Sequence, residues 1–422
     1  MNRSLPVCPD IDTLEQEARE LLRALHAGDV TALAELAEFH PSPSVASELT
    51  LDDAKLLLAR SYQAPSWARV VTACELVDAI WRDDLDTVRR LVTDDPSLLH
   101  ENAIIRPDSH WGRPLTYAAN VGRDGIIRML HARGATDLLS ALDRAVLQGN
   151  IGTARMLHDM LGCPTPPDDA LGGAAYTLSS SGTALMLEFG ARVVDEQGRS
   201  LAPVDVVLET DSRNPSAKHS ILEMYAQHGC ELPDTPMMAL HRGRIDLLEE
   251  QLGADRDLLR RTFSYAEIFP PSLGCRLDEF PRTSLDGATL LHACVEFDEL
   301  DIARWLLVKG MPVDAPTATD ADGFGGHTAL FSAVVCYANF WGNYRGSASE
   351  SPMAKLLLEH GANPNARASM REQLLDGNPY SPTGFREHRD ITPLAWGERF
   401  HNAIVVNKSA MVQISEAGGR NQ

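Results

Sequence analysis

The sequence feature that most limits the fold of this 422-residue chain is a skeleton that occurs twice with the same internal spacing. In residues 112–135 a short apolar segment is followed by a tight turn, a second apolar segment and a glycine. In both copies 21 residues separate the residue that opens the first segment from the glycine, from Arg113 to Gly134 and from Thr289 to Gly310. A helix, a turn, a second helix and a glycine stop, recurring along a chain, predict a stacked helical array.

Fragments of a further motif open other predicted repeats. They are Thr235-Pro236-Met237, Thr289-Leu290-Leu291-His292-Ala293, Thr328-Ala329-Leu330-Phe331 and Thr392-Pro393-Leu394-Ala395. Threonine can cap a helix N-terminus, and proline is pre-organised for the first helical position. The fragments resemble the Thr-Pro-Leu-His-x-Ala opening of the ankyrin repeat. The resemblance implies an all-α solenoid that binds other proteins, and it implies that His292 is structural, bonding within and between hairpin turns.

The predicted array is irregular. Glycines expected to end helices stand at positions 134, 162, 190, 229, 253, 310, 361 and 418, so the gaps run from 24 to 57 residues. The standard repeat is about 33 residues. Because a repeat accepts added residues only in its loops, the long gaps predict insertions. We expect three insertions, at about 263–285, 336–352 and 368–389.

Ahead of the array, residues 1–66 are predicted to form an N-terminal helical cap, and residues 67–422 the repeats. Apolar periodicity predicts helices over 14–26, 30–39 and 50–61. A longer helix is expected from Trp67 to about Trp81. This lead-in resembles a segment found on a broad bacterial group of ankyrin-repeat proteins whose function is poorly defined.

The formal net charge of −21 argues against a general nucleic-acid-binding role, because phosphate contacts need Lys and Arg. A basic protein partner would be steered toward so acidic a chain. The simpler interpretation is that the charge keeps a long protein in solution.

Targeting and cysteine usage indicate a soluble protein of a reducing, cytoplasmic compartment. The N-terminus has no apolar core of a signal peptide, and no apolar run approaches the ~18 residues of a membrane span. Seven scattered cysteines, an odd number, do not form a disulfide framework. We expect no close Cys/His pair at zinc-ligand spacing, and therefore no metal and no cofactor.

Sequence signatures of catalysis are also missing. Gly323-Phe-Gly-Gly326 lacks the lysine of a phosphate-binding loop, and there is neither a Gly-x-Ser-x-Gly elbow nor a His-Glu-x-x-His helix. His292 and Cys294 stand two apart on one predicted helix and therefore do not face each other. A catalytic Cys–His pair at this place is thus disfavoured.

The predicted partner-binding residues gather in the insertion 336–352. They are Tyr337, Phe340, Trp341, Tyr344 and Arg345, in a chain that is only 6% aromatic. Tyr, Trp and Arg dominate binding hot spots because they offer large, fairly rigid contact area. The alternative is that Phe340 and Trp341 fold back onto the neighbouring repeat, and both interpretations are compatible with Tyr337 and Tyr344 turned outward.

A second set of predicted partner-binding residues, Trp111, Arg113 and Tyr117, lies at a hairpin tip and the first helix of one repeat. Ankyrin proteins commonly use this surface. Trp396 is expected instead to pack in the last repeat, which must close the core.

The expected function is a non-catalytic protein–protein interaction scaffold. Sequestration or inhibition of one specific protein is a narrower hypothesis. The alternative is an enzyme or small-molecule binder with a pocket between an insertion and the array. A deep pocket with convergent polar groups and perturbed titrating residues would favour that alternative.

Overall fold

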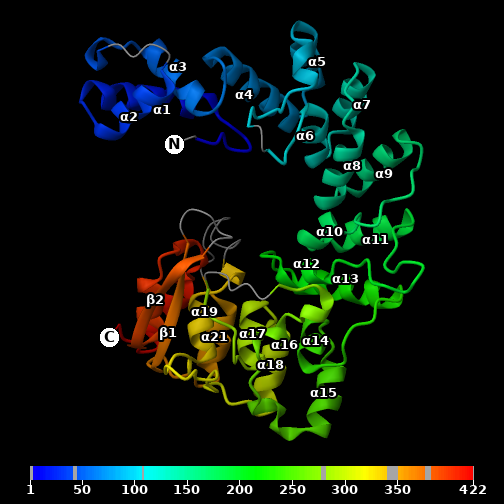
Figure 1. Cartoon of the computed structure of the whole chain (residues 1–422), viewed down its shortest axis with the longest axis vertical. Coiled ribbons are helices and arrows are strands. Elements are labelled where there is room, and N and C mark those ends of the chain that lie inside the picture. Colours follow the sequence, from blue (N-terminus) through cyan, green and yellow to red (C-terminus); the bar gives the residue numbers. More distant parts are fainter. Residues whose placement is uncertain are drawn as a thin grey trace. The chain divides into compact units, whose positions relative to one another are not determined.

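The computed structural model describes residues 3–40, 45–106, 109–276, 282–339, 350–375 and 382–421. The chain is mostly helical, and short helices follow one another in pairs (Figure 1). It divides into two compact units. Unit 1 comprises Met1–Pro166 with Glu188–Gly190, and unit 2 comprises Pro167–Leu187 with Ala191–Gln422.

Unit 1 holds nine α-helices and two short 3-10 helices within the described residues. They are α1 (Ile11–His26), α2 (Val30–Phe39), η1 (Ala46–Glu48), α3 (Leu51–Ser61), α4 (Trp67–Trp81), α5 (Leu85–Asp94), η2 (Pro96–Leu99), α6 (Pro114–Asn120), α7 (Asp124–Ala132), α8 (Leu138–Leu147) and α9 (Ile151–Met160).

The first three helices of unit 1 pack around one apolar core. Leu14 and Leu25 of α1 and Leu58 of α3 are buried there, and the same cluster continues to Val70 of α4. The helices predicted over 30–39 and 67–81 match α2 and α4. Thr50, predicted as helical, is instead the N-cap of α3, where its side chain accepts from the Asp53 N–H. The division into a cap at 1–66 and an array from 67 stays a prediction.

Unit 2 continues the succession of helix pairs. Its helices are α10 (Gly172–Tyr176), most of α11 (Ser180–Glu188), α12 (Val204–Glu209), α13 (Pro215–Gln227), α14 (Pro236–His241), α15 (Ile245–Ala254), η3 (Arg256–Arg260), α16 (Tyr265–Ile268), η4 (Pro271–Leu273), α17 (Leu290–Glu296), α18 (Leu300–Val308), α19 (Ala329–Val334), α21 (Pro352–Glu359), α22 (Pro393–Arg399), η5 (Ala403–Val405) and α23 (Lys408–Glu416). Across the described ranges of both units, none of the helices is long and apolar enough to cross a membrane.

The helix pair predicted from the sequence forms at both places where the full spacing occurs. Helices α6 and α17 begin directly after Arg113 and Thr289. Their partners α7 and α18 are followed by Gly134 and Gly310, whose φ angles of 102° and 93° suit a glycine just past a helix end. The prediction that Gly253 ends a helix is wrong: α15 runs through it to Ala254.

A β-hairpin departs from the expected all-α fold. Strand β1 (Ala368–Leu375) pairs antiparallel with β2 (Pro382–Ile391) in a two-stranded sheet, where the third insertion was predicted. The register places Arg371 opposite Glu387 and Glu372 opposite Arg386, so alternate residues face opposite sides. Figure 1 shows the two strands side by side near the C-terminus. Helix periodicity could not reveal this pairing, because a strand alternates with period 2 and a helix with period 3.6.

Trp396 of α22 lies in the core of unit 2, as predicted. Its side chain is fully buried, and its indole Nε1 donates to Thr283 Oγ1 at 2.8 Å. His292 is also structural, as the ankyrin resemblance implied: its ring contacts Thr289 Oγ1 at 2.8 Å and the His327 carbonyl oxygen at 3.0 Å. His292 therefore joins two successive repeats, whereas Trp396 links the last helix pair to the segment that precedes α17.

Candidate functional site

A cleft of about 630 Å³ lies in unit 2 where two loops of the array meet the β-hairpin. The Ala318 N–H donates to the Gly287 carbonyl at 2.8 Å, and the Gly325 N–H donates to the Ser369 carbonyl, also at 2.8 Å. The first bond links the loop at Gly287 to the loop that contains Ala318 and Gly325, and the second bond links that loop to β1. We call this site the hairpin cleft. Its lining consists of Ser284, Asp286, Gly287, Ala318, Thr319, Asp320, Asp322, Phe324, Gly325, His327, Met370, Arg371 and Phe385.

Gly325 allows the loop that contains Ala318 to fold back on itself and to approach β1 closely. Its φ is 107°, a conformation that L side chains rarely adopt. A Cβ built at this position would lie 2.1 Å from the Ala318 carbonyl oxygen. Only glycine allows the loop to fold back at this point, and the wall of the hairpin cleft depends on it.

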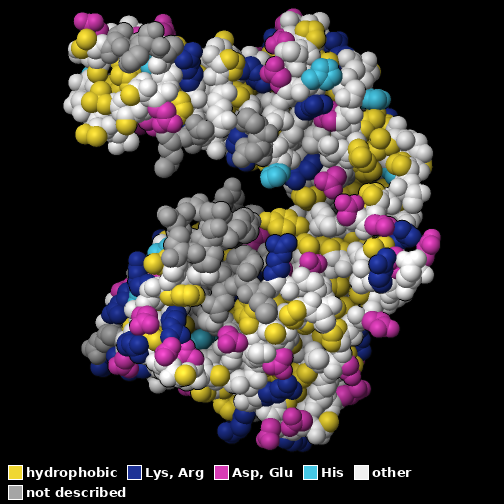
Figure 2. All heavy atoms as spheres, viewed as in Figure 1, with side chains coloured by type: hydrophobic (Ala, Val, Ile, Leu, Met, Phe, Trp, Pro, Cys, Tyr) yellow, Lys and Arg dark blue, Asp and Glu magenta, His cyan; other side chains and the backbone are white. Residues whose placement is uncertain are grey.

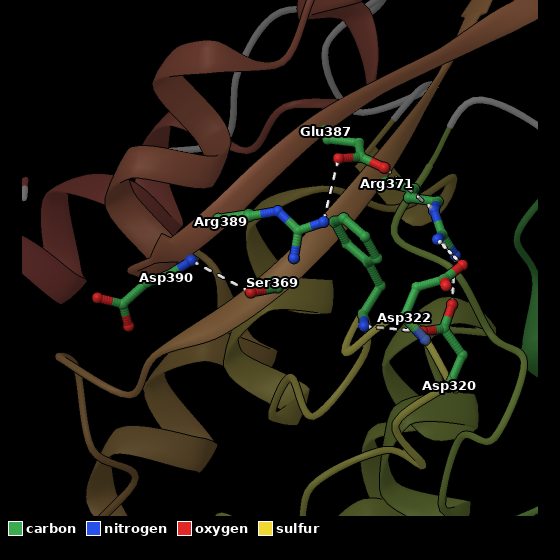
Figure 3. A network of polar contacts seen from close by, with 8 residues as sticks. Asp320, Asp322, Ser369, Arg371, Glu387, Arg389 and Asp390 are labelled. Carbon is green, nitrogen blue, oxygen red and sulfur yellow. Dashed lines mark hydrogen bonds and ion pairs between the residues drawn. The ribbon is translucent and has the colours of Figure 1, made fainter.

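Phe324 lies between two guanidinium groups. The guanidinium carbon of Arg371 is 4.0 Å from the ring centroid, and that of Arg389 is 4.3 Å from it. Arg371 also pairs with Asp320, and its Nη2 donates to Asp322 at 2.8 Å. Figure 3 shows Arg371 of β1 turned toward the two aspartates, while Arg389 lies near Glu387, both on β2. The contacts fix the outer face of the hairpin against the array.

The lining of the hairpin cleft carries net negative charge at neutral pH. It holds three carboxylates, from Asp286, Asp320 and Asp322, against the single guanidinium of Arg371. The Phe324 N–H donates to Asp320, and this bond, with the Arg371 pair, holds the pKa of Asp320 below its usual value. Burial lowers the pKa of His327 to about 3, so that its ring is neutral. The cleft therefore favours a positively charged group.

The opposite face of the hairpin holds a buried carboxylate. Glu372 is fully buried and accepts from the His401 N–H and from His401 Nδ1, both at 2.6 Å. Its other oxygen lies 2.8 Å from His388 Nε2. Burial by itself would raise the pKa of Glu372, but these hydrogen bonds hold it below its usual value. The network fixes β1 and β2 to the segment that follows α22.

A buried ion-pair cluster lies beneath the start of the insertion 336–352. The Arg213 Nη2 donates to Glu296 Oε1 at 2.6 Å, and Arg282 Nη1 lies 3.6 Å from the same oxygen. Each of the three side chains is less than a tenth exposed. Next to it, Lys218 Nζ lies 2.7 Å from Glu299 Oε1, and both of these groups are buried. These charges are paired, which is the condition for tolerating them in a core.

The ring of Tyr337 packs against the arginines of this cluster and is only partly exposed. Its ring is half-buried, with the guanidinium carbon of Arg282 5.1 Å and that of Arg213 5.9 Å from its centroid. The Tyr337 N–H donates to Glu296 Oε2 at 3.3 Å. Burial raises the pKa of its hydroxyl. The other predicted residues of this insertion, Phe340, Trp341, Tyr344 and Arg345, lie outside the described residues.

The three residues predicted to bind a partner in unit 1 differ in their exposure. Tyr117 is fully buried; its hydroxyl donates to the Val7 carbonyl at 2.6 Å and accepts from Trp81 Nε1 at 2.8 Å. The prediction that Tyr117 contacts a partner is therefore wrong, because its ring offers no surface. Trp111 is half-buried against Tyr117, with centroids 5.1 Å apart. Arg113 lines a second cleft, of about 690 Å³, together with Asp143 and other residues of α8.

Part of the chain matches a known protein family. A family model described as the ankyrin repeat matches residues 286–320 and 325–369, which include α17, α18, α19, α21 and one wall of the hairpin cleft. The chain therefore contains ankyrin repeats. Ankyrin repeats are generally protein–protein interaction modules and are typically non-catalytic.

Among solved structures, the ankyrin repeat domain of human ASB11 is similar, with 16% sequence identity over 73% of this chain and 99% of that one. The TM-score is 0.26, so this likeness does not establish a common arrangement of the two chains. No curated protein matches the sequence.

Sequence reasoning did not find the hairpin cleft. The stretch Gly323-Phe-Gly-Gly326 lacks the lysine of a phosphate-binding loop, and its glycines instead mark the turn that reaches β1. A signal for the outer face of the hairpin was present in the alternation of Phe385, Glu387 and Arg389, which has the period of a strand. This alternation lies inside the predicted insertion at about 368–389.

Proposed function

We propose that this chain is a non-catalytic protein-binding module and that the hairpin cleft receives an extended segment of its partner. The observation that carries this proposal is the combination of an acidic lining with an exposed aromatic rim. Phe385, which lines the cleft, is 57% exposed, whereas Phe324 is held between two arginines. A preformed surface of this kind binds without a large ordering cost.

The partner segment proposed for the cleft carries Lys or Arg beside an apolar side chain. A cation would approach the carboxylates of Asp286 and Asp322, and the apolar group would cover Phe385. Asp322 is 73% exposed, so its carboxylate can be reached although one oxygen accepts from Arg371. On the face shown in Figure 2, acidic and basic side chains are interspersed. The local lining, more than the overall charge, therefore supports a basic segment.

The test is selection of peptides from a random phage-displayed library on the immobilised full chain. We expect enrichment of sequences with Lys or Arg next to an apolar residue. In Phe385→Ala the affinity of such a peptide should fall about tenfold, the effect of a contact worth about 1.4 kcal/mol. Val308→Ala, at a residue of α18 that is 74% exposed, is the matched control and should bind normally. No enrichment, or equal losses in both variants, would refute the proposal.

A second candidate function is binding of a cationic small molecule in the same cleft. The volume of about 630 Å³ falls within the ~300–1,000 Å³ typical of ligand sites, and the cleft lies between the hairpin and the array. Catalysis is less well supported, because Asp320 and Arg371 are paired with each other and His327 is bonded to backbone. Calorimetric titration with arginine and with a polyamine distinguishes this candidate, since a peptide-binding cleft would hold either only weakly.

The aromatic insertion is a separate proposed contact. Because Tyr337 packs against Arg213 and Arg282, the informative variant is Phe340→Ala/Trp341→Ala, which spares that packing. Loss of partner binding with an unchanged thermal unfolding midpoint would support a contact role. A lowered midpoint with unchanged binding would instead show that these rings cover the array.

The narrower hypotheses also stay proposals. Sequestration or inhibition of one partner would follow from a binding site that covers a functional surface of that protein. A cytoplasmic location fits the seven cysteines, all of which are free thiols. For unit 1 we propose contacts through Trp111 and, at the second cleft, through Arg113.

A further inference from the structure

Three metal-ligand side chains converge in unit 1 where α9 ends. After α9 the chain turns through Gly162 and Cys163, both with positive φ (81° and 54°). The Cys163 N–H donates to the His158 carbonyl at 3.0 Å, which brings the thiol back over the last helical turn. A ring nitrogen of His158, a carboxylate oxygen of Asp159 and Cys163 Sγ all lie within 4.8 Å of one another. Within the described part of the chain no other such group of three is present.

His158 is the fixed member of this group. It is 7% exposed, and its ring stacks on Phe189 with centroids 3.7 Å apart and planes at 8°. Its Nε2 lies 3.0 Å from the Pro164 carbonyl oxygen. Contacts of this kind orient the imidazoles of metal sites before the ion binds. The ring therefore needs no reorganisation of its packing to present a donor.

Asp159 and Cys163 are exposed and can move to meet an ion. Cys163 Sγ lies 3.7 Å from Asp159 Oδ1. Ligand distances of about 2.0–2.3 Å around a tetrahedral zinc ion place donor atoms roughly 3.5 Å apart, so this pair is already near the required separation. Small side-chain rotations would close the distances to His158.

The surrounding charges favour a cation at this place. The C-terminal end of a helix carries partial negative charge, and the site lies at the C-terminal end of α9. The guanidinium of Arg155 interacts with the Asp159 carboxylate through space, but both of its donor nitrogens bond to Glu188, at 2.6 and 2.5 Å. No hydrogen bond between Arg155 and Asp159 therefore has to break when an ion binds.

We propose that His158, Asp159 and Cys163 form a surface site for one zinc-class divalent ion, with a fourth position open to water or to a partner's side chain. Imidazole, thiolate and carboxylate together suit Zn²⁺ and Co²⁺, whereas Mg²⁺ and Ca²⁺ prefer oxygen ligands alone. The sequence expectation that no Cys/His pair stands at zinc spacing is wrong here. His158 and Cys163 are separated by four residues, a spacing within the range of zinc ligands.

The experiment is a Co²⁺ titration of the full chain, followed by the absorption band that a thiolate–cobalt bond produces in the near ultraviolet. One Co²⁺ per chain should bind, and Zn²⁺ should displace it and abolish the band. Cys163→Ser should remove the band, and Asp159→Asn should weaken binding at least tenfold. Loss of an outer-shell partner alone costs about 10–100-fold in metal affinity, so loss of a ligand should cost no less.

The matched control is Cys8→Ser, which removes the other exposed cysteine of unit 1. This variant should bind Co²⁺ as the unchanged protein does. Because Cys163 and Asp159 are exposed, their variants should fold normally, which circular dichroism would verify. Absence of the band at millimolar Co²⁺, or a band that persists in Cys163→Ser, would overturn the proposal. Binding should also weaken as pH falls, because the ligands must be deprotonated.

Discussion

The guanidinium of Arg371 lies 4.0 Å from the ring centroid of Phe324, and 47 positions of sequence separate the two residues. The same guanidinium pairs with Asp320 and Asp322, so one side chain of the hairpin binds both the aromatic and the acidic residues of a repeat loop. This relationship makes the hairpin part of the wall of the cleft.

Arg371→Lys is expected to weaken peptide binding at the hairpin cleft although the charge is retained. A lysine cannot bind two carboxylates with a planar fork and stack on Phe324 at the same time. The loss should be about 1 kcal/mol, near the value of one cation–π contact at a partly exposed site. Calorimetry with a selected peptide measures it. Arg386→Lys, on the opposite face of the hairpin, is the control, and an equal loss there would contradict this account.

Gly325→Ala is expected to destabilise unit 2 and to open the cleft. The added Cβ would lie 2.1 Å from a backbone oxygen, which cannot move away as a flexible side chain could. Gly323→Ala is a close control, since Gly323 also has a positive φ of 84° but no atom within 4 Å of the added Cβ. Both variants bear the cost of a left-handed alanine, about 1–2 kcal/mol. If chemical denaturation shows no larger loss for Gly325→Ala, the close approach is not a constraint.

Glu296→Gln is expected to lower the free energy of unfolding by about 3–5 kcal/mol, the cost of breaking a buried ion pair from one side. The carboxylate is 1% exposed and neutralises Arg213, with Arg282 also nearby. Removal of its charge would break the buried pair with the Arg213 guanidinium from one side. Glu249→Gln, in an exposed pair with Lys309, should change stability by no more than about 1 kcal/mol. Equal effects of the two variants would show that the buried cluster is not a special source of stability.

Stability should fall as the solution is acidified below about pH 6.5. Burial lowers the pKa of His292 from 6.5 to about 4 and that of His327 to about 3. The unfolded chain therefore binds protons between these values and pH 6.5 while the folded chain does not, so the stability present above pH 6.5 is lost as pH falls toward the folded pKa values.

The variant His292→Gln cannot titrate, and its thermal midpoint should depend less on pH across this window than that of the unchanged chain. The exposed His228, changed to Gln, is the control and should leave the dependence intact. A dependence unaltered by His292→Gln would mean that other groups govern acid sensitivity.

The sequence by itself determined the helix pairs of this protein. Apolar periodicity, caps such as Thr289 and glycines such as Gly310 are local signals, and a helix forms from contacts within about four residues. The bounds of α2 and α4 and the structural role of His292 could be predicted for this reason. The structural burial of Trp396 followed from the need to close a stack of repeats.

Only the tertiary structure decided where the candidate sites lie. The contact of Arg371 with Phe324 and the burial of Tyr117 depend on residues that packing brings together, and their spacing in sequence carries no periodic signal. The proximity of Cys163 to His158 also depends on the turn after α9. If the helix continued, the Cys163 thiol would not lie over the last helical turn. Local chemistry specified the repeats, and long-range packing specified the surfaces that a partner or an ion could use.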